Sequence, residues 1–193
     1  NHTTTTAYDA RGRVTRLTNH DATHTDFAYD LGGRRTSVTD PLGRSTSYSY
    51  DDYGRLETVA DPIGGTTRYA YDGDESTPSK IVDPERGVTR LDVAGGVVRR
   101  VVDPDGVEVR YGFDGHGELT SVTDAAGNTA LVERDAAGRV TATVSPSGSR
   151  TEVAYDPVGR PTSRRGPDGG VTRYEWTAAG RPAAVIDPLG ARR

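Results

Sequence analysis

The stretch YDDYGRLETVADPIGGTTRYA, residues 50–70, decides the fold of this chain. It contains two turn signals, Asp-Asp-Tyr-Gly at 51–54 and Asp-Pro-Ile-Gly at 61–64. In the second, aspartate caps the turn, proline presets φ and glycine closes it, while the glycine of the first is free to adopt positive φ. The segments 55–59 and 66–71 are rich in Thr, Val and Tyr, which favour strands. The stretch therefore predicts two short strands joined by tight turns, a β-hairpin unit.

This unit recurs along the whole chain with a period of about 21 residues. The repeats start at Tyr8, Tyr29, Tyr50, Tyr71, Val93, Phe113, Arg134, Tyr155 and Trp176. The spacing is 21 throughout, apart from one 22 that is followed by one 20. Residues 1–193 are therefore predicted to form a single array of about eight full repeats with partial ends, a fragment of a larger protein. Residues 71–154 keep the register but lose much of the motif.

The aromatic residues follow the same period. Of thirteen, seven occupy repeat starts, five lie two positions before a start, and Tyr53 alone is elsewhere. Stacked repeats would align these positions into a ladder, which we interpret as a buried core between layers in preference to a sugar-stacking platform. Tyr53 is the better sugar candidate because it breaks the period.

One detail conflicts with simple strand alternation. Leu56 and Val59 are three residues apart, and their equivalents recur in other repeats. Strict alternation would place them on opposite faces of the sheet. Either a bulge in each repeat or a strand covered on both faces would explain the spacing.

Composition narrows the class of protein. Only 33% of the residues are hydrophobic, which suits thin layers better than one deep core, and no stretch has helical periodicity. The net charge of −4 is spread along the chain without a basic block, so no nucleic-acid partner is expected. No apolar run approaches the length of a membrane span, and the absence of cysteine excludes disulfides and thiolate metal sites. The fold class expected is all-β, built of tandem antiparallel β-hairpins.

The motifs YDxxGR and DPxGxxTxYxYD resemble the YD repeats of the Rhs family over essentially the whole chain. Similar repeats occur in bacterial polymorphic toxins, in the cocoon-forming subunits of Tc toxins and in teneurins. The resemblance implies a curved, spiralling sheet that forms part of a hollow shell, a bacterial protein that is secreted or displayed at the cell surface, and a cargo such as a toxin domain. The implied partners are the remainder of the same polypeptide, an encapsulated toxin domain, and carbohydrate or a cell-surface protein.

No catalytic motif is present, so the chain is not expected to be an enzyme and no catalytic, cofactor-binding or metal-binding residue is assigned. His20 and His24 lie across a predicted turn with no third ligand. The recurring aspartates are interpreted as turn caps in preference to calcium ligands. The arginines that follow the turn glycines are expected to pair with these aspartates, although they could instead contact an acidic partner. They are Arg13, Arg34, Arg55, Arg139, Arg160 and Arg181.

The function expected is therefore structural, a non-catalytic segment of a shell that scaffolds or encapsulates a cargo. The alternative is an adhesion module that binds carbohydrate or protein.

Overall fold

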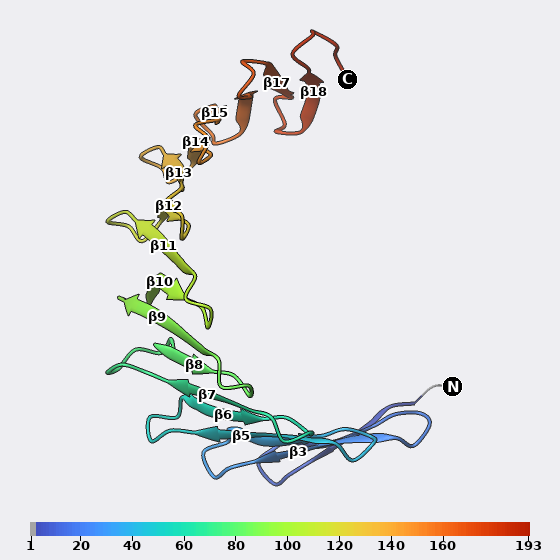
Figure 1. Ribbon diagram of the computed structural model, residues 1–193. Helices are drawn as coiled ribbons and strands as arrows, with labels where there is room; N and C mark the ends of the chain where they lie inside the picture. The colour runs from blue at the N-terminus through green and yellow to red at the C-terminus, as the bar shows by residue number, and fades with distance from the viewer. Residues whose placement is uncertain (1–2) are drawn as a thin grey trace. The chain divides into compact units, whose positions relative to one another are not determined.

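The computed structural model describes residues 3–193, which form eighteen β-strands and no helix (Figure 1). They divide into two compact units, one ending at Gly106 and one running from Val107 to Arg193. The described part of the chain therefore holds no helix that could cross a membrane. The prediction of an all-β chain of antiparallel hairpins is confirmed.

In the first unit, ten strands follow one another, and each pairs antiparallel with the next. They are β1 (Thr5–Tyr8), β2 (Val14–Thr18), β3 (His24–Tyr29), β4 (Arg35–Thr39), β5 (Ser45–Tyr50), β6 (Leu56–Ala60), β7 (Thr66–Ala70), β8 (Lys80–Val82), β9 (Val88–Ala94) and β10 (Val97–Val102).

The second unit repeats this arrangement with eight strands, again paired antiparallel in chain order. They are β11 (Glu108–Phe113), β12 (Leu119–Thr123), β13 (Thr129–Arg134), β14 (Val140–Val144), β15 (Arg150–Tyr155), β16 (Pro161–Arg165), β17 (Val171–Trp176) and β18 (Pro182–Ile186).

A β-bulge in each regular repeat explains the three-residue spacing of the aliphatic positions. Tyr48 lies opposite Val59 and Tyr50 lies opposite Leu56, so one residue of β6 is left over between the two pairs. The same register shift recurs at six other repeat starts, Tyr8, Tyr29, Phe113, Arg134, Tyr155 and Trp176. The bulge turns Leu56 and Val59 to the same face, so the first of the two explanations is correct.

The irregular spacing of the middle repeats also has a structural cause. The 22-residue interval contains the longer connection between β7 and β8, at residues 71–79. The 20-residue interval contains a tight turn between β9 and β10, in which Gly95 and Gly96 have φ values of 63° and 78°. Positive φ at two successive residues is typical of a two-residue hairpin turn. One connection is longer and the next shorter, so the register recovers.

The prediction of a buried core between layers is wrong for the residues described. In each unit the strands form one layer, and among the described residues only two hydrophobic residues are buried, Ala142 and Ala184. The aromatic side chains of the strands are mostly half-buried, because each packs against its neighbours in the same sheet and no second layer covers it. Such a sheet relies on contacts between adjacent repeats.

Candidate functional site: the junctions between repeats

The Tyr-Asp turn is held by its aspartate. The Oδ1 atom of Asp51 accepts hydrogen bonds from the backbone amides of Tyr53 (3.0 Å) and Arg55 (2.8 Å), and Oδ2 accepts one from Nε of Arg55 (2.8 Å). The Gly54 amide donates to the Asp51 carbonyl, with φ of 82° at the glycine. The interpretation of the aspartates as turn caps is confirmed here. The Asp-Pro turns use the same geometry, as Asp40 and Arg44 show.

The arginine that closes this turn also reaches the next repeat. The guanidinium carbon of Arg55 lies 4.4 Å from the centre of the Tyr71 ring, and Nη1 donates to the carbonyl of Gly73 at 2.8 Å. The Tyr71 hydroxyl in turn donates to the carbonyl of Leu56 at 2.8 Å. Asp51, Arg55 and Tyr71 therefore join one repeat to the following one by an ion pair, a cation–π contact and hydrogen bonds.

We call this arrangement the repeat clamp: an aspartate, an arginine four residues later, and the aromatic residue that starts the next repeat. Within residues 3–193 it occurs at five junctions, Asp9–Arg13–Tyr29, Asp30–Arg34–Tyr50, Asp51–Arg55–Tyr71, Asp135–Arg139–Tyr155 and Asp156–Arg160–Trp176. In each, the Tyr hydroxyl or the Trp indole N–H donates to a carbonyl fifteen residues earlier, at 2.8–2.9 Å.

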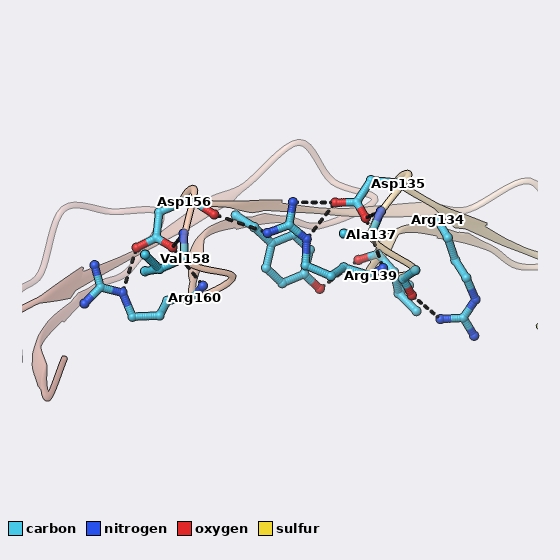
Figure 2. Close-up of polar contacts among 10 residues, drawn as sticks. Arg134, Asp135, Ala137, Arg139, Asp156, Val158 and Arg160 are labelled. Carbon is cyan, nitrogen blue, oxygen red and sulfur yellow. Dashed lines mark hydrogen bonds and ion pairs between the residues drawn. The ribbon is translucent and has the colours of Figure 1, made fainter.

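Figure 2 shows two successive aspartate–arginine pairs of the second unit. Nε of Arg139 donates to Asp135 at 2.7 Å, and Nη1 of the same arginine reaches the carbonyl of Asp156 at 3.2 Å. Asp156 is itself paired with Arg160. The clamp at Arg139 therefore contacts the next one, and Arg13 reaches the carbonyl of Asp30 in the same way.

The hydrogen bonds stabilise the charged form of the turn aspartates. The Arg34 backbone amide, and after it the Arg34 guanidinium, hold the pKa of the Asp30 carboxyl below its ordinary value despite partial desolvation. The Arg44 guanidinium and backbone amide lower the pKa of Asp40 in the same way. These carboxylates are therefore structural anions of the turns.

The predicted arginine–aspartate pairing is confirmed for five of the six arginines. Arg181 is the exception, because Thr177 stands where the aspartate should be, and the Arg181 amide donates to the threonine hydroxyl instead. The contact of each arginine with the aromatic ring of the next repeat was not predicted. Its signal in the sequence is the constant interval of sixteen residues between the arginine and that ring.

In the second unit, one junction departs from the clamp. Glu118 occupies the arginine position of the repeat that starts at Phe113, and Arg134 occupies the aromatic position of the next. The two side chains form an ion pair, Nη2 to Oε2, of 3.4 Å. Arginine can therefore occupy the aromatic position here, because Glu118 has replaced the arginine that would otherwise face it.

The remaining candidate residues do not assemble into a site. His24 begins β3 and lies 3.7 Å from Asp26, whereas His20 lies in the preceding turn of residues 19–23. Within residues 3–193, no group of three or more His, Asp and Glu side chains is arranged to hold a metal ion. Tyr53 is 76% exposed, as its place outside the period predicts.

These features define a class of protein, a tandem β-hairpin array whose repeats are joined by aspartate, arginine and aromatic side chains. The Teneurin YD-shell model matches residues 1–114, and the RHS Repeat model matches residues 113–150, 134–171 and 155–192. The chain belongs to the YD-shell and RHS repeat family. No curated protein sequence matches it.

Solved structures of this fold include TcdB2-TccC3 complexes. The crystal structure of TcdB2-TccC3-TEV matches with a TM-score of 0.60 at 19% identity, and that of TcdB2-TccC3 with 0.61 at 18%. Each match covers 95% of this chain and 12% of the other. The chain therefore spans about an eighth of the length of these relatives and shares their fold over that part.

Proposed function

We propose that this chain is a non-catalytic wall segment of a secreted or surface-displayed bacterial Rhs-like shell that scaffolds or encloses a cargo such as a toxin domain. The observation that carries the proposal is the repeat clamp. Its charged groups, which could otherwise form a binding or catalytic site, are used to join one hairpin to the next. A sheet joined in this way is extended by repetition, which suits a wall.

The two faces of the sheet support the same proposal. One face carries the aromatic and aliphatic pairs, such as Tyr48 opposite Val59. The other face carries ion pairs such as Arg16 with Asp26, and Arg150 with Glu133. A single layer with two chemically different faces is suited to separating an interior from an exterior. The remainder of the same polypeptide is the partner expected to complete the enclosure.

Protease protection tests the enclosure. The entire reading frame that encodes this chain would be expressed and treated with protease while folded, and again after the shell has been unfolded in urea. We expect fragments beyond the repeat array to survive in the folded protein and to be cut only after unfolding. Equal cleavage in both states would contradict enclosure, while leaving the wall architecture to be tested by the clamp variants below.

A second candidate, an adhesion surface for carbohydrate, rests on Tyr53. Its ring is exposed at the tip of a turn, with the Arg55 guanidinium 4.9 Å from the ring centre. Exposed aromatic rings can stack on sugars. Binding on a glycan array that is lost in Tyr53→Ala would favour this candidate. Val158→Ala is the matched control, because Val158 occupies the same turn position and is also exposed. Loss in both variants, or no binding at all, would contradict it.

A further inference from the structure

The junction between Glu118 and Arg134, which we call the ionic junction, lacks the arginine and the aromatic ring of the repeat clamp. With Glu118 in place of arginine, Asp114 cannot form the aspartate–arginine pair of the other turns. Its Oδ1 still accepts from the amides of His116 and Glu118, so the turn itself is intact. With Arg134 in place of an aromatic residue, there is no ring for a guanidinium to cover.

The substitute contacts are poorer than those they replace. The ion pair of Arg134 with Glu118 measures 3.4 Å, against 2.7 Å from Arg139 Nε to Asp135 at the next turn. Arg134 Nη1 donates at 3.1 Å to the Gly138 carbonyl of its own turn. Arg134 Nε is buried and has no hydrogen-bond partner in the described part of the chain. A buried donor without an acceptor is destabilising.

The ionic junction also borders a hollow in the surface. A hollow of about 780 Å³ lies beside Arg134, lined among others by His116, Glu118, Val132 and Glu133. Its lining includes Arg134 itself, which occupies the position of the ring at the clamped junctions. The missing ring contact and the unpaired nitrogen both make separation of the two hairpins less costly here than at the clamped junctions.

We propose that the ionic junction is a salt-sensitive joint, at which the sheet of the second unit opens before it opens at the clamped junctions. The Glu118 side chain of this pair is 52% exposed and that of Arg134 21%, so dissolved ions reach the pair from the glutamate side and screen it. The clamps keep their ring contacts and the hydrogen bond from the aromatic residue when salt is added, because these depend less on charge. Ionic strength therefore acts selectively on one junction.

Hydrogen exchange on the full 193-residue chain tests the proposal without any variant. Exchange of backbone amides is measured at about 0.02 M and about 1 M NaCl, between which the screening length falls from tens of ångströms to about 3 Å. We expect exchange across residues 118–134 to accelerate about fivefold at high salt, which is the effect expected from the loss of one surface ion pair. Exchange across residues 139–155, the matched clamped junction, should change by less than about twofold. Equal responses at the two junctions would overturn the proposal.

Two reciprocal variants locate the effect. Glu118→Arg with Arg134→Tyr restores the clamp sequence and should abolish the salt response of residues 118–134. Arg139→Glu with Tyr155→Arg transfers the ionic pair to the neighbouring junction and should confer the response on residues 139–155. A restored clamp that keeps the full salt response would also overturn the proposal. Circular dichroism checks that each variant retains its strands.

Discussion

The guanidinium carbon of Arg55 lies 4.4 Å above the ring centre of Tyr71, which starts the following repeat. The same arginine closes its own turn through Asp51. One side chain thus couples the shape of a turn to the position of the next hairpin. Since each sheet is a single layer, this coupling takes over part of the role that a buried core has in thicker folds.

Replacing Arg55 by lysine should destabilise the protein by about 1–2 kcal/mol. Lysine keeps the charge but has no planar group to stack on Tyr71 while also bonding Asp51. Urea unfolding measures the change. Arg44→Lys is the control, because Arg44 is 62% exposed and pairs with Asp40 alone, and it should cost less than about 0.5 kcal/mol. Equal losses in the two variants would show that the ring contact contributes nothing.

Removing the hydroxyl of Tyr71 should cost about 1 kcal/mol. Tyr71→Phe keeps the ring under Arg55 but leaves the Leu56 carbonyl without its donor. Tyr71→Ala removes the ring as well and should cost clearly more, about 2–3 kcal/mol, less than for a fully buried aromatic residue. Urea unfolding of both variants separates the hydrogen bond from the stacking. A phenylalanine variant as stable as the parent would show that the hydroxyl bond has no net effect.

Substitutions at two equivalent turn positions should change the stability of the protein in opposite directions. Gly43 (φ 78°) and Ala22 (φ 66°) are both the fourth residue of an Asp-Pro-type turn, and Ala22 is one of only two non-glycine residues with positive φ in the described chain. Gly43→Ala should destabilise by about 1 kcal/mol, and Ala22→Gly should stabilise by a similar amount. Nothing lies within 4 Å of a Cβ at Gly43, so packing does not complicate the comparison. Changes in melting temperature of the same sign would contradict the backbone explanation.

Acid should weaken the fold through the turn aspartates. The pKa of Asp30 and of Asp40 is lowered in the folded chain, so the unfolded chain binds more protons near pH 4. The stabilisation is therefore complete above the unfolded pKa of about 4, and it is lost as the pH falls through the folded pKa. Melting temperature measured from pH 7 to pH 2 should fall below about pH 4, and Asp30→Asn should lower the stability at pH 7 and flatten the fall. A flat profile would contradict the role of these carboxylates.

The turns and strands could be predicted because they depend on local residue types. Asp, Pro and Gly define the turns, and Thr, Val and Tyr define the strands. The bulge could only be offered as one of two explanations, since the spacing of Leu56 and Val59 does not reveal which residue is left over. The contact of Arg55 with Tyr71 was missed because it joins two repeats. The buried core was wrong because a periodic aromatic position does not show whether anything covers it.

The coupling between Arg55 and Tyr71 tests the central claim most directly. A double-mutant cycle with alanine at both positions, measured by urea unfolding, isolates their interaction from other effects of each substitution. We predict a coupling energy of about 1 kcal/mol for this pair, and none for Arg55 with Tyr29, which belongs to a different clamp. A coupling of zero between Arg55 and Tyr71 would contradict the account, because adjacent repeats would then be joined by the strand backbone alone.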